Sequence, residues 1–338
     1  MTIIEKILEI LMSPPVFIPL IFPGFITVMI ILLILIWFER KLTAKVQMRY
    51  GPLYIFKHFG GIIQMVADLL KYLFSEFIIP KDADKKVFIL APILFFTFNL
   101  LPIVAIPLSS TFTAMQIDLT LLYVPAIGTL APLMMILIGW SSNNKYSFIG
   151  SLREGYILMS YEIPMFMSIL AMAIAYNSLS LIQIVEQQST LPWGILFNPL
   201  AAITFFGTLL MTTARFPFDI SEAESEIVVG PYTEYSGIFF VLCLGAPYVR
   251  LYVLSLFYAI VFLGGWNPLI WPLNTSPILS GIMILFKAAI VMGLTVFMRS
   301  IYPRYRLDNA LKLGWHKLSV LSVLSVITSL ALIGLGVL

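Results

Sequence analysis

The sequence predicts an all-α integral membrane protein with about eight transmembrane helices and one amphipathic helix at the cytoplasmic interface. Of its 338 residues, 60% are hydrophobic and 11% are charged, and the mean hydropathy is +0.99. Soluble domains carry roughly 25% charged residues, so this chain has too few charges to cover a water-facing surface. Long apolar runs recur along the chain, and lysine and arginine gather in every second connection between them.

The apolar runs define the expected spans, because a helix needs about 20 apolar residues to cross a hydrocarbon core of roughly 30 Å. The candidates are residues 16–38, 87–108, 121–140, 155–177, 199–215, 236–263, 277–300 and 317–338. The fifth run is short, and Pro247 in the sixth predicts a kink. No internal repeat or low-complexity linker divides the chain, so we treat residues 1–338 as a single polytopic membrane domain. The first residues lack the pattern of a cleaved signal peptide, and we expect them to be retained.

The basic residues predict the orientation, because lysine and arginine are enriched in cytoplasmic loops. With the spans above, 17 of the 20 basic residues fall in connections on one side. The alternate connections, 109–120, 178–198 and 264–276, contain none. We therefore expect a multi-pass protein of the cell membrane with its main loops in the cytoplasm and both termini outside.

The segment 61–79 is too polar to span a bilayer but has helical periodicity. Its apolar positions are Ile62, Val66, Leu69, Leu70, Leu73 and Phe77, and they lie opposite Asp68, Lys71 and Ser75. This pattern predicts an amphipathic helix lying on the cytoplasmic interface. Two interpretations stay open: a helix that merely rests on lipid, or a mobile wall beside the entrance for a lipid-soluble substrate.

Composition excludes several kinds of site. Cys243 is the single cysteine, and there are two histidines, so the chain alone holds no disulfide framework, iron–sulfur cluster or haem pair. We expect no cofactor and no metal to be bound by this chain. A net charge of +3 without a basic stripe does not suggest a nucleic-acid partner.

Ionisable residues inside the spans call for an explanation, because each costs about 2.5–3.5 kcal/mol on insertion scales. Glu39 and Arg40 end the first span, either as interfacial anchors or as part of a site. Glu162 lies in the fourth span, either as a proton-relay carboxylate or as an interhelical hydrogen-bonding group. Arg250 and Lys287 lie within the sixth and seventh spans, and we expect one of them to pair with Glu162.

The segment 215–237 concentrates acids among apolar residues on the basic side of the membrane. The acids are Asp219, Glu222, Glu224, Glu226 and Glu234. Clustered carboxyl groups near an apolar environment raise one another's pKa, which suits proton exchange near neutral pH. The alternative is an ordinary solvated acidic loop.

Five blocks of sequence occur in the order found in one known family. They are ERK at 39–41 with QMRYGP at 47–52, Q..AD..K....E...P from 64 to 80, GWSSNNKYSFIGSLR at 139–153 running into SYEIP, RFPFDISEAESE with EYSG from 215 to 237, and GGW at 264–266 with RSIYPRYRLD at 299–308. With these blocks the chain resembles, over about residues 16–318, the membrane subunit of respiratory complex I (NADH:quinone oxidoreductase) that forms the quinone pocket.

The resemblance implies a subunit without redox activity of its own, in a quinone-reducing and proton-translocating complex. The residues it places at the quinone chamber are Glu39, Arg40, Asp68, Arg215, Asp219 and Arg299. The residues it places in the acidic loop and proton path are Glu162, Glu222, Glu224, Glu226 and Glu234. It implies quinone as substrate, with iron–sulfur clusters held by hydrophilic partner subunits. Further partners would be small membrane subunits and antiporter-like subunits.

The chain departs from this family at two acids. The family usually has A-E-x-x-R before P-F-D, and Thr212 replaces that acid here. It usually has A-E-Y in the sixth span, and here the sequence is Ala246-Pro247-Tyr248. We expect a proton path that is rerouted through Glu162 or altered in its coupling. Leu53 also replaces an asparagine after Gly-Pro, and the stretch to Gln64 is about two residues longer, which changes the expected quinone doorway.

Two rival functions remain. The membrane anchor of an energy-converting hydrogenase shares the P-F-D and E-Y-S-G motifs, but the Q-x-R-x-G-P and P-R-Y-R-x-D blocks favour the quinone family. A stand-alone secondary transporter would show an inverted repeat or paired broken helices, and the sequence shows neither. The electron donor (NADH, reduced F420 or ferredoxin) and the quinone type stay open.

Overall fold

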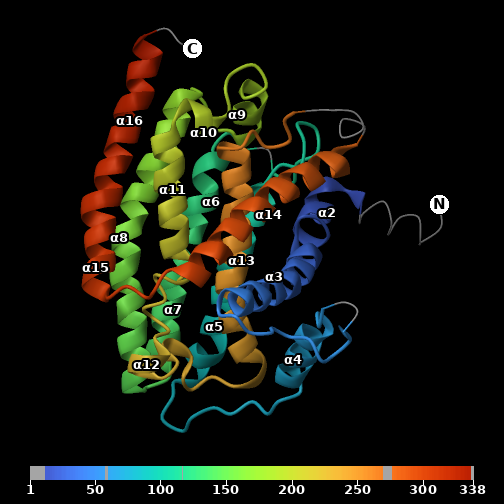
Figure 1. Ribbon diagram of the computed structural model, residues 1–338, viewed down its shortest axis with the longest axis vertical. Helices are drawn as coiled ribbons and strands as arrows, with labels where there is room; N and C mark the ends of the chain where they lie inside the picture. Colours follow the sequence, from blue (N-terminus) through green and yellow to red (C-terminus); the bar gives the residue numbers. More distant parts are fainter. Residues whose placement is uncertain (1–11, 58–59, 116, 269–275, 336–338) are drawn as a thin grey trace, which may run out of the picture.

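The computed structural model describes residues 12–57, 60–115, 117–268 and 276–335. Within these ranges the regular secondary structure is helical throughout (Figure 1). The elements are α2 (Pro14–Leu20), α3 (Phe25–Val46), α4 (Ile63–Leu73), α5 (Lys85–Leu100), η2 (Leu101–Ala105), α6 (Thr120–Gly128), α7 (Leu130–Ser141), α8 (Lys145–Ala175), α9 (Leu181–Gln187), α10 (Gly194–Phe197), α11 (Pro199–Thr212), α12 (Glu224–Ile227), η3 (Gly230–Tyr232), α13 (Gly237–Val261), α14 (Pro277–Ile301), α15 (Leu307–Lys312), η4 (Leu313–Leu318) and α16 (Ser319–Gly334).

Seven helical stretches of the described chain are long and apolar enough to cross a membrane. They are Pro14–Val46, Lys85–Ala105, Thr120–Ser141, Lys145–Ala175, Gly237–Val261, Pro277–Ile301 and Leu307–Gly334. This confirms the all-α integral membrane fold, with each stretch overlapping one expected span.

The fifth expected span, 199–215, is a helix but is too short to count among these seven. α11 has 14 residues, and at 1.5 Å per residue it is about 21 Å long, less than the roughly 30 Å hydrocarbon core. The Asn198 side chain accepts a hydrogen bond from the Ala201 amide at 3.0 Å and caps the start of the helix. At the other end Ala214 has a φ of 46°, which stops the helix before Arg215.

Three helical stretches extend well beyond their expected limits. The last of them, α15 to α16, begins at Leu307, ten residues before the expected 317. α8 begins at Lys145, ten residues before the expected 155, because the Asn144 side chain caps it by accepting from the Tyr146 amide at 2.9 Å. Arg153 and Glu154 therefore lie on a transmembrane helix, and the expectation that they belong to a connection is wrong. α3 continues to Val46, so Glu39 lies within a helix instead of ending it.

In Figure 1 the bundle has two parts. α8, α11, α13 and α16 run along the long axis, while α3 and α14 cross it diagonally and pack against α13 (Figure 1). α13 is the central helix, since every residue from Val249 to Val261 on it is buried. α16 packs along α8 and α11 with small buried residues, and Asn198 donates to the Ser325 carbonyl at 2.7 Å.

α4 is the expected amphipathic helix, although it is shorter than the predicted 61–79. It packs on α13 through Tyr72 and Phe240, whose ring centroids are 5.6 Å apart. After Leu73 the chain leaves the helix, and Phe77 still contacts Phe239 at 4.4 Å between centroids. An apolar face at helical spacing stays exposed, and its members are Ile63, Val66, Leu70 and Leu73. This face supports a position on a membrane surface.

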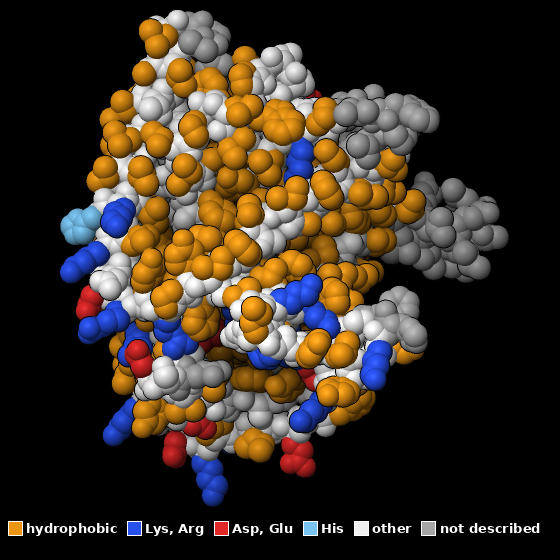
Figure 2. Space-filling view, viewed as in Figure 1, with side chains coloured by type: hydrophobic (Ala, Val, Ile, Leu, Met, Phe, Trp, Pro, Cys, Tyr) orange, Lys and Arg blue, Asp and Glu red, His pale blue; other side chains and the backbone are white. Residues whose placement is uncertain are grey.

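Charged side chains gather at one end of the molecule, the end where α4 and α12 lie (Figure 2). The remainder of the face shown is largely hydrophobic (Figure 2). This division is the one expected for a chain whose middle is surrounded by lipid and whose charged end meets water.

Among the residues that the structure describes, Lys287 forms no ion pair with a carboxylate. It is buried, and its ammonium donates to the Leu263 carbonyl at 2.6 Å, to the Gly265 carbonyl at 2.8 Å and to the Asn267 carbonyl. The same ammonium lies 4.6 Å from the Trp193 ring. Lys287 is therefore not the partner of Glu162, because the irregular backbone after α13 supplies its acceptors.

Replacing Lys287 with methionine is expected to destabilise the loop after α13. The change would leave three carbonyl groups without this donor, and the two that are buried would each cost about 1–3 kcal/mol. The thermal midpoint of the purified complex and the protease sensitivity of this loop are the measurements. A methionine variant as stable as the wild type would contradict the assignment of Lys287 as a loop anchor.

Candidate functional site: a carboxylate–arginine cluster at the charged end

Residues far apart in the sequence converge on the Glu39 carboxylate. Glu39, on α3, forms ion pairs with Arg215, which follows α11, and with Arg299 near the end of α14. The Tyr248 hydroxyl, from α13, donates to Glu39 Oε1 at 3.3 Å. The Arg215 guanidinium also lies 3.5 Å from the centre of the Tyr248 ring. We call these four residues the Glu39 cluster.

Burial makes the electrostatics of the Glu39 cluster strong. Glu39 is 6% exposed and Arg215 is 5% exposed, whereas the Arg299 side chain retains 30% exposure. One carboxylate faces two guanidinium groups, so the cluster carries a net positive charge. In a site of low dielectric constant such a charge acts more strongly than in water. The cluster can therefore attract a polar head group on which negative charge develops.

Arg40 and Asp68 join α3 to α4. Arg40 donates to Asp68 Oδ2 at 2.8 Å, and Gln64 donates to Asp68 Oδ1 at 2.9 Å. These side chains are partly exposed. The pair therefore contributes little to stability, but it holds α4 beside the turn of α3 that carries Glu39.

The segment after α11 carries the predicted Asp219. Arg304 donates to Asp219 Oδ2 at 2.9 Å and to Ser225 Oγ at 3.3 Å. The Phe216 ring contacts two arginines, with its centre 5.0 Å from the Arg304 guanidinium and 5.8 Å from that of Arg299. Through Phe216 this pair adjoins the Glu39 cluster.

Glu222 has the environment of a proton-exchanging group. Burial, together with the nearby Asp219 and Glu154 carboxyl groups, raises the pKa of Glu222 to about 8. The Tyr232 hydroxyl faces it, and burial raises the pKa of Tyr232 well above its ordinary value. Glu222 therefore titrates near neutral pH.

The other acids of the segment serve as links between elements. Arg153 on α8 donates to Glu226 at 2.5 Å, and Asn144 donates to Glu234 at 2.5 Å. Glu226 is exposed, which fits the alternative of an ordinary solvated acid at that position. Glu224 begins α12, and its side chain lies outside the described part of the structure.

Inside the bundle, Glu162 is half-buried, and within the described residues it has no ion pair with Arg250 or Lys287. Arg250 instead donates to the Tyr161 hydroxyl at 3.3 Å. The expected pairing of Glu162 with one of these two cations is therefore wrong. The most deeply buried acid of α8 is Glu154, at 2% exposure, which sequence reasoning missed because it placed this residue in a connection.

Tyr248 and Arg304 are the other residues that sequence reasoning did not assign to the site. Arg304 stands in the RSIYPRYRLD block, so a signal for it was available in the sequence. Tyr248 stands at the tyrosine of the family's A-E-Y motif, so it also had a signal, although Pro247 replaces the acid before it. Its role depends on the approach of α3 to α13, which only the fold determines.

A hollow with apolar walls opens on the face where α3 and α4 lie, toward the charged end (Figure 2). Among the residues that the structure describes, no group of three or more His, Cys, Asp or Glu side chains is arranged to hold a metal ion. The Glu39 cluster, α4 and the segment after α11 thus gather charged and apolar groups at one end of the bundle.

Comparison with known proteins agrees with this arrangement. The family model described as NADH dehydrogenase matches residues 20–330. A subunit of the NADH-quinone oxidoreductase of Geobacillus sp. (strain WCH70) is 38% identical over 288 residues, 85% of each chain. A subunit of the F(420)H(2) dehydrogenase of Methanosarcina acetivorans is 35% identical over 313 residues, 89% of this chain and 88% of the relative.

A third relative belongs to another bacterium. A subunit of the NADH-quinone oxidoreductase of Rickettsia prowazekii is 38% identical over 297 residues, 86% of each chain. In all three complexes the matching subunit is the one designated by the letter H. The chain therefore belongs to the NADH dehydrogenase family, as a multi-pass membrane subunit of the complex I type.

Proposed function

We propose that this chain forms the quinone-binding chamber of a complex I-type oxidoreductase and links quinone reduction to proton translocation. One observation carries the proposal. Glu39, Arg215 and Arg299, which the family resemblance assigns to the chamber, come from three separated parts of the chain and meet in one cluster.

The charge of the Glu39 cluster explains physically why it would bind a quinone that is being reduced. A quinone that accepts electrons gains negative charge on its oxygens before it is protonated. Two guanidinium groups opposed by one carboxylate stabilise that charge and orient the head group, most strongly where water is excluded. The chain itself takes no electron, and the redox centres would be the iron–sulfur clusters of hydrophilic partner subunits.

α4 fits the entrance of such a chamber. A long-tailed quinone arrives through lipid, and α4 has an exposed apolar face on one side and the Arg40–Asp68 pair on the other. The apolar hollow beside it has walls of the right character for an isoprenoid tail (Figure 2). Of the two interpretations of this helix, this arrangement favours the wall of a doorway over a helix that only rests on lipid.

The acids after α11 would supply protons to the chamber, with Glu222 as the donor whose pKa lies nearest to neutral pH. We place the charged end in the cytoplasm and both termini outside, in the cell membrane. The terminal residues 1–11 and 336–338 lie outside the described part of the structure. Partners would be the hydrophilic subunits below the chamber, small membrane subunits and antiporter-like subunits.

The test is competitive labelling of the purified complex with a photoreactive quinone analogue. We expect labelling of this chain near the Glu39 cluster, suppression by excess unlabelled quinone, and at least 10-fold lower labelling in Arg299→Met. Labelling that unlabelled quinone does not suppress would contradict the proposal. Mass spectrometry of the same sample identifies the partner subunits and so distinguishes the two candidate functions. A nickel–iron hydrogenase partner would assign the chain to the membrane anchors of energy-converting hydrogenases.

A further inference from the structure

The buried carboxyl group of Glu154 is not explained by the Glu39 cluster. It is 2% exposed, and among the described residues its Oε2 atom has no hydrogen-bond partner. Together with Asn99, Thr212 and Arg250 it lines a small cavity between α5, α7, α8, α11 and α13. A carboxyl oxygen in such a position is costly unless it binds water or a proton.

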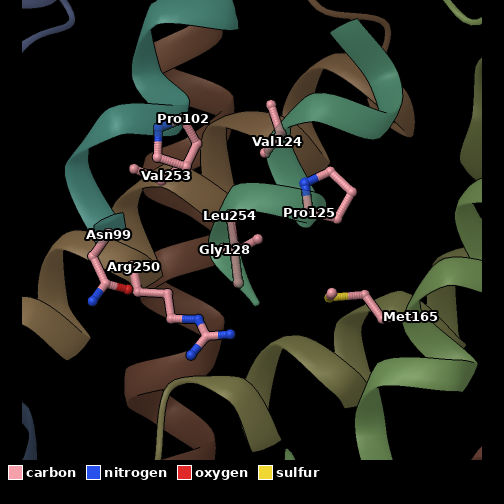
Figure 3. A pocket seen from close by; sticks show the side chains of 9 residues that line it. All are labelled: Asn99, Pro102, Val124, Pro125, Gly128, Met165, Arg250, Val253 and Leu254. Carbon is pink, nitrogen blue, oxygen red and sulfur yellow. The ribbon is translucent and has the colours of Figure 1, made fainter. Parts of the chain in front are cut away.

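The cavity and its neighbour have the dimensions and lining for water. Each has a volume of about 10 Å³, roughly the space needed for one water molecule. Asn99 and Arg250 line both cavities, and Figure 3 shows the Arg250 side chain beside the first one. Asn99 Oδ1 and Arg250 Nε also lack a hydrogen-bond partner within the described chain. With Glu154 Oε2 they provide three polar atoms, enough to hold a buried water.

Glu154 is connected on both sides. Toward the charged end it faces Ser221, Asp219 and Glu222. Toward the membrane interior it faces Arg250, which hydrogen-bonds to the Tyr161 hydroxyl and acts electrostatically on Glu162. Electrostatic interactions therefore extend from the acids of the segment after α11, through Glu154 and Arg250, to Glu162.

We propose that Glu154 is a proton-carrying carboxylate of the membrane interior, which takes protons from Glu222 and exchanges them with water held beside Asn99 and Arg250. The proton leaves the Glu222 carboxyl group for the Glu154 carboxylate, and Glu222 is protonated again from the aqueous side. Glu154 then gives its proton to the cavity water, which passes one onward. This inference rests on the proposed function, because quinone reduction supplies the driving force.

The position of Glu154 also accounts for the departures from the family pattern. Thr212 and Pro247, where the family usually has acids, line the same cavity as Glu154. This chain thus has one carboxyl group, on α8, in the cavity whose α11 and α13 positions usually carry acids in the family. Arg250, from α13, balances its charge.

Membrane vesicles that contain the complex provide the test, with NADH and F420H2 tried in turn as donor and a short-chain benzoquinone as acceptor. Quinone reduction and dye-reported proton translocation are measured together. We expect Glu154→Gln and Glu154→Ala to lower proton translocation at least fivefold. Adding Thr212→Glu to Glu154→Ala is expected to restore at least half of it, which a packing role would not do. Glu186→Gln, an exposed acid on α9, is the matched control and is expected to translocate like the wild type.

The outcomes separate the two proposals. Undiminished translocation in Glu154→Gln, with quinone reduction that Arg299→Met abolishes, would overturn the role of Glu154 and leave the chamber standing. A wild-type complex that reduces no quinone would overturn both. If Glu154→Gln does not assemble, infrared spectra of wild-type and Glu154→Asp complexes test whether Glu154 changes its protonation state. A carboxyl band that changes on quinone reduction and shifts in Glu154→Asp supports the proposal, and identical spectra overturn it.

Discussion

Replacing Glu39 with alanine is expected to destabilise the assembled protein by about 3–5 kcal/mol, the usual cost of removing one partner of a buried ion pair. Two guanidinium groups would lose their common carboxylate, and Arg215 is almost fully buried. The two positive charges would then repel each other in a region of low dielectric constant. The thermal midpoint of the complex and the amount assembled on a native gel are the measurements. Quinone reduction is expected to fall with them.

Arg40→Gln is the matched control, because it removes an ion pair on the next residue of the same helix. That pair is half-exposed, so we expect a change in stability of about 0–1 kcal/mol. Glu39→Gln separates charge from shape, since glutamine keeps the size of the side chain. If Glu39→Ala and Arg40→Gln shifted the thermal midpoint equally, the buried cluster would not have the energetic weight assigned to it.

Replacing Glu222 with glutamine is expected to remove a pH dependence of both stability and activity. The carboxyl group has an ordinary pKa of 4.5 and a folded pKa of about 8. Between these values the folded chain holds a proton that the unfolded chain has released, so the free energy of unfolding falls as pH rises. Glu222→Gln stays neutral and is expected to lack this decline, as seen in unfolding midpoints measured from pH 5 to pH 9.

The activity of the same variant tests its role as a proton donor. Wild-type quinone reduction is expected to decline as pH rises through about 8, where Glu222 loses its proton. Glu222→Gln is expected to be about 10²-fold slower at pH 7, the lower end of what a positioned acid contributes. Glu226→Gln, an exposed acid of the same segment, is expected to keep the wild-type pH profile. A Glu222→Gln complex with the wild-type rate and profile would rule out the donor role.

Much of the membrane architecture follows from local sequence. Apolar runs mark the helices because lipid offers no partner to an unpaired backbone group, so long apolar stretches must be helical. The amphipathic spacing around Asp68 likewise predicted α4. The limits of helices were less predictable, since α8 starts at the Asn144 cap and α11 stops where Ala214 adopts a positive φ. These ends depend on single backbone conformations that periodicity does not report.

For the charged residues, too, the sequence predicted one property and the structure was needed for another. Their presence in apolar runs marked Glu39, Arg250 and Lys287 as residues that need partners, but not which partners. Lys287 takes carbonyl groups exposed by the loop after α13, and Arg250 faces Glu154 and Tyr161 instead of pairing with Glu162. Each choice follows from which helices are neighbours.

The sequence by itself determined that this protein is a helical membrane protein, and its ordered motifs placed it in the family of complex I membrane subunits. Both properties rest on composition, on local spacing and on residue identity. Only the tertiary structure decided that Glu39 binds Arg215 and Arg299, and that Glu154, Thr212 and Pro247 share one cavity. These contacts join residues from α3, α8, α11, α13 and α14, and their energy depends on distance and burial, which long-range packing alone sets.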